Sequence, residues 1–298
     1  MPPTHHAAMG LLSSSFSVTY LSVFASVAYI RSWFRTRSDS PKSISSWRLG
    51  SFLFGMFLVW AALGSPLTNY DHDLLTVHMI QHLLLMTFAP ALILMGEPLL
   101  IFWNGLPQFG KVVLSPTFRR PIVEYFGRAI SRPAFCWIVS AFTLIGWHVP
   151  SLFALGMHSE LWHWVEQASF LAAGFLFWVP VIRPWPEVST GPQWSTLIYL
   201  FLATLPCDIL SGILVFSERV AYPTYFSTPR HFGFSALEDQ QCAAALMWTC
   251  VTLVYLVPAA ILSIRLLSPL SFFRGEFAQS EVHVSAVAPG DPQRLEIV

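Results

Sequence analysis

Long apolar stretches with almost no charge recur along this 298-residue chain, and they constrain its fold more than any other feature. About 20 apolar residues, rising ~1.5 Å each in an α-helix, are needed to cross the hydrocarbon core of a bilayer. Seven stretches come close to or reach this length: residues 7–30, 49–70, 74–96, 133–159, 161–182, 195–217 and 240–264. The sequence therefore predicts an all-α, polytopic membrane bundle of about seven transmembrane helices.

The composition agrees with a lipid environment and argues against several classes of function. Hydrophobic residues make up 54% of the chain and charged residues 11%, against roughly 25% charged residues in a soluble domain. The formal net charge of zero gives no electrostatic basis for binding nucleic acid. The chain has no GxSxG, no P-loop and no GxGxxG after a strand, so we expect a protein that is not an enzyme.

The distribution of basic residues predicts the orientation of the bundle. Lys and Arg accumulate in cytoplasmic connections, and of the 16 here only Arg219 and Arg230 fall on the other side. This places the N-terminus outside and the C-terminus in the cytoplasm. The apolar piece 99–106 is too short to cross and fits an interfacial segment. Residues 1–270 thus form the transmembrane domain, and the polar, aperiodic tail 271–298 is expected to be disordered.

Histidine and acidic residues gather at one level of this predicted bundle. His78 and His82 are four residues apart, which puts both rings on one helix face, roughly 6 and 12 Å below the outer end at ~1.5 Å per residue. At a similar depth the other predicted helices carry His148, His163, Glu166, Cys207 and Asp208. Ionisable groups in hydrocarbon must face the bundle interior and find partners. We therefore expect one polar cavity that opens to the outside.

The residue types in this cavity suit copper or zinc. Two imidazoles on one helix face can hold a single ion, with further imidazoles, thiols or carboxylates completing the site. The predicted metal-binding residues are His78, His82, His148, His163, Glu166, Asp208 and Cys207. Soft donors that favour Cu(I) are Met79, Met157, Met247, Cys207, Cys242 and Cys250. Two alternatives stay open: imidazoles on facing helices can ligate haem iron in a haem or quinone redox protein, or they can simply stabilise helix contacts in a scaffold.

Several motifs occur in one order along most of the chain. They are HMIQHLLL at 78–85, GEPL at 96–99, WHVP at 147–150, GFLFWVP at 174–180, YPTY at 222–225, DQQ at 239–241 and MW at 247–248. In this set the chain resembles the CtaG-type cytochrome c oxidase assembly factors, over about residues 74–255, and that family has a seven-helix membrane fold.

The resemblance implies a role in maturing a haem–copper oxidase in the bacterial cytoplasmic (inner) membrane. The family would handle copper for the oxidase on the outer side, with an oxidase subunit, another copper chaperone or a second copy of the chain as partner. Its histidine pair corresponds to His78 and His82, its Trp-His-x-Pro histidine to His148, and its histidine before Glu to His163. One departure is Gln167, where related sequences often have a histidine; either that position supports a ligand, or this chain binds copper through fewer nitrogens.

Overall fold

The computed structural model describes residues 5–39, 45–107, 109, 132–182, 193–228 and 233–268. Throughout these ranges the regular structure is helical and no strand is found, which confirms the predicted all-α class. The elements are α1 (His5–Asp39), α2 (Ser46–Leu63), η1 (Pro66–Asn69), α3 (Leu75–Leu83), η2 (Leu84–Phe88), α4 (Ala89–Met95), α5 (Pro98–Gly105), α8 (Pro133–His148), α9 (Pro150–His158), α10 (Glu160–Ile182), α11 (Gln193–Phe216), η3 (Pro223–Phe226) and α12 (Ala236–Leu267). The predicted tail 271–298 lies outside the described residues.

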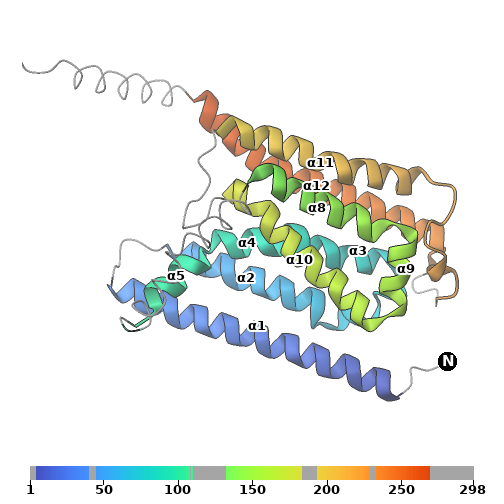
Figure 1. Cartoon of the computed structure of the whole chain (residues 1–298), viewed down its shortest axis with the longest axis horizontal. Coiled ribbons are helices and arrows are strands. Elements are labelled where there is room, and N and C mark those ends of the chain that lie inside the picture. The colour runs from blue at the N-terminus through green and yellow to red at the C-terminus, as the bar shows by residue number, and fades with distance from the viewer. Residues whose placement is uncertain are drawn as a thin grey trace, which may run out of the picture.

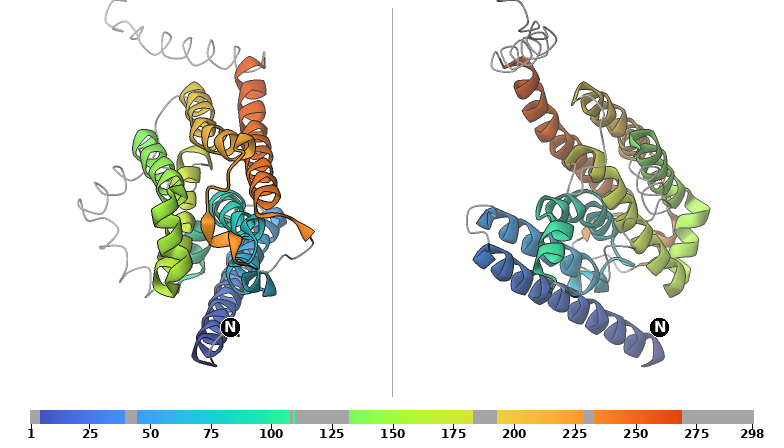
Figure 2. Two further views of the ribbon diagram at one scale, coloured as in Figure 1. Left: turned by 90° about the vertical axis from the view of Figure 1, so that its right-hand side faces the viewer. Right: turned by 60° about the vertical axis from the view of Figure 1, so that its left-hand side comes forward.

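One span lies at the centre of the bundle and the other helices surround it. It runs over Leu75–Met95 through α3, η2 and α4, and two thirds (67%) of its most apolar window is buried. On one side α4 packs against α2, which packs against α1; on the other, α3 packs against α12, and α10 packs against α4 and α8 (Figure 1). Helix α11 packs along α12, and the two further views in Figure 2 show the same order of helices. Polar side chains on α3 are thus kept away from lipid.

Among the described residues, five helices are long and apolar enough to cross a membrane, and a bent pair of helices makes a sixth if the pair forms one span. The five are Ser46–Asn69, Leu75–Met95, Glu160–Ile182, Trp194–Phe216 and Ala236–Leu267. The stretch 133–159, expected to be one span, is α8 followed by α9 with a 74° bend between them. The side chains of the first predicted span are described only from residue 15 onward, so the count of seven and the orientation stay predictions.

The bend between α8 and α9 has a local cause. Pro150 disfavours helical backbone at the residue before it, and Val149 is extended there, with φ −65° and ψ 125°. Pro150 then begins α9, where its missing N–H and fixed φ are tolerated. The chain therefore turns at Val149, and α9 runs across the end of the bundle at which α1 begins (Figure 1).

Helix α3 receives its N-terminal cap from another helix. Leu74, the residue before α3, has no side chain that can accept a hydrogen bond. Instead the Asp239 carboxylate, at the start of α12, accepts from the backbone N–H of Leu75 at 2.7 Å and of Thr76 at 3.1 Å. A carboxylate at a helix N-terminus satisfies free donors and favours the helix dipole. Asp239 thus ties the N-terminal end of the central span to α12.

The central span contains one wide turn, η2, immediately after the second histidine. The Ala89 N–H donates to the carbonyl of Leu84, five residues back, as in a π-helix. Pro90 follows, and a proline inside a helix lacks the donor and crowds the preceding turn. After this turn Ala89 and Ile93 pack in the cluster of α1 and α2, while Leu94 remains in the cluster of Met79 with α10, α11 and α12.

Helix α10 approaches this wide turn so closely that only glycine fits. A Cβ atom added at Gly174 would lie 2.5 Å from the carbonyl oxygen of Met86. The absence of a side chain at Gly174 therefore lets α10 lie against the central span. This contact brings the N-terminal half of α10 beside α3, where the candidate site is formed.

Candidate metal centre

Two imidazoles and one carboxylate form a fully buried cluster between α3 and α10. The rings of His78 and His82 lie one turn apart on α3 with centroids 4.3 Å apart. Their Nε2 atoms each lie 3.4 Å from Oε1 of Glu166 on α10. The side chains are only 0%, 5% and 1% exposed. The structure therefore brings together three of the predicted ligands, and these are geometrically able to hold one ion.

The polar atoms of this cluster lack hydrogen-bond partners in the described part of the chain. Both nitrogens of His78, both of His82 and both carboxylate oxygens of Glu166 are buried without one. Their mutual contacts are within ion-pair distance but do not have hydrogen-bond geometry. Burying polar atoms unsatisfied is costly, and a cation coordinated by the ring nitrogens and the carboxylate would satisfy them. The donor set thus fits a metal ion.

Helix α9 closes one side of Glu166. A Cβ atom added at Gly156 would lie 2.8 Å from Oε2 of Glu166. The carboxylate therefore occupies the space that any other residue at 156 would fill. Because α9 reaches this position through the bend at Val149, the bend contributes directly to the site.

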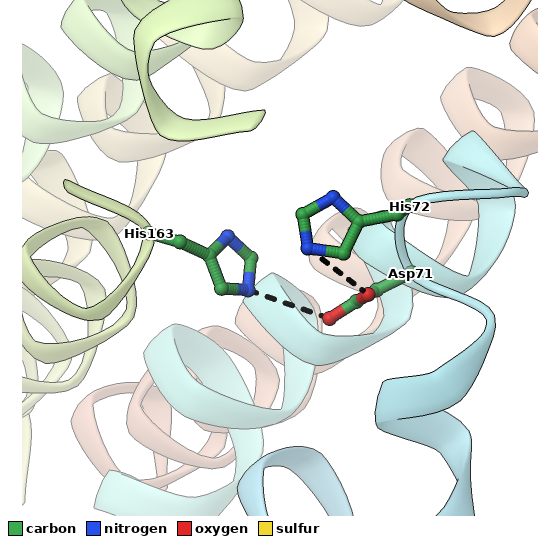
Figure 3. A group of neighbouring side chains, drawn as sticks. All are labelled: Asp71, His72 and His163. Atoms are coloured by element: carbon green, nitrogen blue, oxygen red, sulfur yellow. Dashed lines mark ion pairs between the residues drawn. The ribbon is translucent and has the colours of Figure 1, made fainter. Parts of the chain in front are cut away.

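His163, another predicted ligand, connects the buried cluster to a second group nearer the surface. Its Nδ1 lies 3.5 Å from Oε2 of Glu166, one turn along α10. Its Nε2 lies 3.3 Å from Oδ2 of Asp71, in the connection before α3, and Oδ1 of Asp71 lies 3.7 Å from Nε2 of His72. Figure 3 shows the His72 and His163 rings on either side of the Asp71 carboxylate. Asp71, His72 and His163 form a second set that could hold an ion.

The protonation states of Asp71 and His72, which lie outside the membrane-spanning helices, favour metal binding. Burial raises the pKa of the Asp71 carboxyl, but the His163 ring and the charges of nearby imidazoles outweigh it, so the pKa lies below its ordinary value. Burial lowers the pKa of His72 by more than the Asp71 carboxylate raises it, so that pKa is also low. At neutral pH the pair is thus a carboxylate and a neutral imidazole, the forms that coordinate metals.

His148 lies next to the cluster and faces a sulfur. Its ring centroid is 6.1 Å from that of His82. Its Nδ1 lies 2.7 Å from the carbonyl oxygen of Leu144, which can only accept, so Nδ1 carries the proton. The unprotonated Nε2 then points at the thioether sulfur of Met79, 3.3 Å away. Two lone-pair donors meet there, an arrangement suited to a soft cation.

The two remaining predicted ligands lie apart from the cluster. Cys207 lines a small apolar cavity of about 40 Å³ that also borders His82, and its Sγ lies 3.8 Å from the Ser211 hydroxyl. Asp208 belongs to neither ligand group that the described residues form. Both are on α11, which packs along α12 instead of against α3. The depth estimated from residue counts therefore predicted proximity to the cluster less well for residues of α11 than for residues of α3 and α10.

Asp71 and Gln81 were not identified as functional candidates from the sequence, whereas Gln167 was considered there as a supporting position. Gln167 donates to Gln81 at 3.2 Å, and Gln81 donates to Oδ2 of Asp71 at 3.2 Å. Gln167 thus supports the neighbourhood of His163 through hydrogen bonds. Asp71 is drawn inward by these contacts and by Tyr225, whose hydroxyl donates to the Asp71 carbonyl at 3.0 Å. The position of His72 between two aspartates was the one visible signal, and nothing in the pattern showed that this connection folds onto α10.

A cavity of about 210 Å³ borders His163. Its lining residues are Ser15, Ala62, Leu63, Thr68, Asp71, His72, Gln81, Met157, His158, Glu160, His163, Trp164 and Gln167. They include two carboxylates and no Lys or Arg. Of the predicted metal-binding residues, only His163 lines this cavity, which lies beside α9.

Comparison with known proteins shows the family of this chain. The model of the cytochrome c oxidase caa3 assembly factor family, Caa3_CtaG, matches residues 27–268, which is most of the chain. The chain belongs to this family. The match to Caa3_CtaG includes the central span, α9 and α10, and therefore all three residues of the buried cluster.

Two curated relatives of this Caa3_CtaG chain are uncharacterized proteins, one of Mycobacterium bovis and one of Mycobacterium tuberculosis. Each is 23% identical over 224 residues, covering 70% of this chain. The chain spans about a third (33%) of the length of each relative. No solved structure matches it.

Proposed function

We propose that this chain is a non-enzymatic assembly factor of the bacterial inner membrane that binds copper for a cytochrome c oxidase. The ion is held by His78, His82 and Glu166, with His148 and His163 at either side. The observation that carries the proposal is the set of buried ring nitrogens and carboxylate oxygens without hydrogen-bond partners. Membership of an oxidase assembly family supplies the recipient. An oxidase subunit or another copper chaperone is the partner that this function requires.

The charge of the cluster favours a monovalent ion. Two neutral imidazoles, one carboxylate and Cu(I) sum to no net charge, whereas Cu(II) or Zn(II) leaves one positive charge in a buried site. An uncompensated charge away from water is costly. The contact between His148 and Met79 adds soft donors at 3.3 Å from one another, which Cu(I) prefers.

The proposal is tested by metal analysis of the full chain purified in detergent after exposure to Cu(I) and removal of loose ions. We expect wild-type protein to retain copper and His82→Ala to lose it. His158→Ala is the matched control, because His158 is exposed and belongs to neither ligand group. Equal copper in wild type and His82→Ala contradicts the proposal. A Soret band in the purified protein points instead to haem.

A complementation assay separates copper handling from scaffolding. Cells that depend on this chain for oxidase maturation receive the wild type, the double variant His78→Ala, His82→Ala, or His158→Ala. We expect the double variant to be present in the membrane at wild-type level while oxidase activity is lost. Full oxidase activity with the double variant would mean that the histidines only support helix contacts.

A further inference from the structure

The geometry points to a second, outer metal site at Asp71, His72 and His163, which receives the ion from outside and passes it inward through His163. This inference deepens the proposed function and rests on it. One donor atom from each residue lies within 4.8 Å of the other two. The measured contacts are 3.7 Å from His72 to Asp71 and 3.3 Å from His163 to Asp71. Ligands about 2 Å from one ion are separated by such distances.

The outer group is reachable and the inner group is not. All three outer residues line the 210 Å³ cavity, and the His72 side chain is 47% exposed. None of His78, His82 or Glu166 lines that cavity. Among the described residues, the cavity lining carries the carboxylates of Asp71 and Glu160 and no Lys or Arg, so its field favours cations. An ion that approaches the buried cluster from this side therefore meets the outer group first.

Asp71 is held in place as a ligand would be. Its side chain is 4% exposed, and Gln81 donates to its Oδ2. Its other oxygen, Oδ1, is buried, has no hydrogen-bond partner, and is the atom nearest to His72. A buried carboxylate oxygen aimed at an imidazole and left unsatisfied marks a place where a cation would be stabilised.

His163 belongs to both groups through different nitrogens. Nε2 faces Asp71, and Nδ1 faces Glu166. A neutral imidazole has one unprotonated nitrogen at a time, so His163 can coordinate on the outer or the inner side but not on both. Transfer is then a ligand exchange without change of oxidation state: the ion leaves Asp71 and His72, gains Glu166, and is captured by the two imidazoles of α3. The His163 proton moves to the nitrogen that the ion has left.

The test measures how fast Cu(I), supplied as a complex with a competing chelator, is taken up by the full chain in detergent. We expect His72→Ala to reach the wild-type copper content at equilibrium but to load several times more slowly, because the ion then lacks one ligand of the group that it meets first. His158→Ala, which removes an imidazole from the same cavity wall, should load at the wild-type rate. Asp71→Asn should load slowly like His72→Ala.

The outcomes separate the outer site from the proposed function. Loading of His72→Ala at the wild-type rate overturns the outer site, while copper lost only in His82→Ala leaves the inner site standing. Absence of copper from the wild type contradicts the proposed function itself. If Asp71→Asn unfolds because a buried contact is lost, His72→Gln gives the answer, since His72 is half-exposed and its replacement leaves the core intact.

Discussion

Single atoms decide the shape of the buried cluster, and Gly156 is the clearest example. A Cβ atom at position 156 would lie 2.8 Å from Oε2 of the Glu166 carboxylate, which is too close for two atoms that are not bonded. The carboxylate cannot move far in response, because His78, His82 and His163 surround it. A methyl group at this place would therefore push against the Glu166 carboxylate and change the ligand geometry.

We expect Gly156→Ala to weaken Cu(I) binding by roughly 10- to 100-fold, the usual effect of disturbing groups that orient metal ligands. The measurement is competition with a chelator of known affinity. Gly146→Ala is the control, because a Cβ there meets nothing within 4 Å and Gly146 lies in α8, one turn before the bend. Unchanged affinity in Gly156→Ala would show that Glu166 is not a ligand.

At the scale of helices, the cap from Asp239 holds the entrance of the central span in place. The carboxylate accepts two backbone N–H groups of α3 and the Thr76 hydroxyl at 2.6 Å. Asp239 is buried, so water cannot readily replace these bonds when it is removed. The first turn of α3 contains Thr76 and leads to His78, which makes the position of the first ligand dependent on α12.

Asp239→Ala is expected to destabilise the protein by about 1–3 kcal/mol, because two helix donors lose a charged acceptor. Thermal unfolding in detergent should show a clear fall in Tm. The control is Glu238→Ala, whose exposed side chain bonds only the backbone of Ser235, so its Tm should fall less. Similar Tm values for the two variants would be inconsistent with this role of Asp239.

The elements themselves could be predicted to different degrees. Spacing placed His78 and His82 on one face of a helix, and the i, i+3 pair on α10 placed His163 beside Glu166, because helix geometry is local. The bend at Val149 had a visible cause in Pro150, but the apolar length of 133–159 favoured a single span. Asp71 could not be predicted, since its position depends on hydrogen bonds from Gln81 and Tyr225 across the fold.

At the scale of the whole molecule, the arrangement predicts from which side of the membrane the proposed copper site takes up ions. Helix α9 and the start of α12 lie at the end where α1 begins (Figure 1), and residues of α9 line the cavity. The basic residues of the sequence predict that this end faces outward. In this orientation, the outer group of Asp71, His72 and His163 takes up ions from the extracytoplasmic space.

This orientation is tested with a reporter fused to the C-terminus. Green fluorescent protein should fluoresce there, because it folds in the cytoplasm, and alkaline phosphatase at the same position should be inactive. A fusion of each reporter after residue 228, in the connection before α12, is the control and should give the opposite pattern. Active phosphatase at the C-terminus would reverse the predicted topology and place the cavity on the cytoplasmic side.

The wide turn η2 sets the angular relation between the two halves of the central span. Each residue advances an α-helix by about 100°, so a single extra residue in a turn rotates everything after it by that amount relative to what comes before. Upstream of η2 the helix directs imidazoles toward α10; downstream it directs Ala89 and Ile93 toward α2. Deleting one residue between 84 and 88 would therefore rotate Ala89 and Ile93 away from α2 whenever the imidazoles of α3 keep their place beside Glu166.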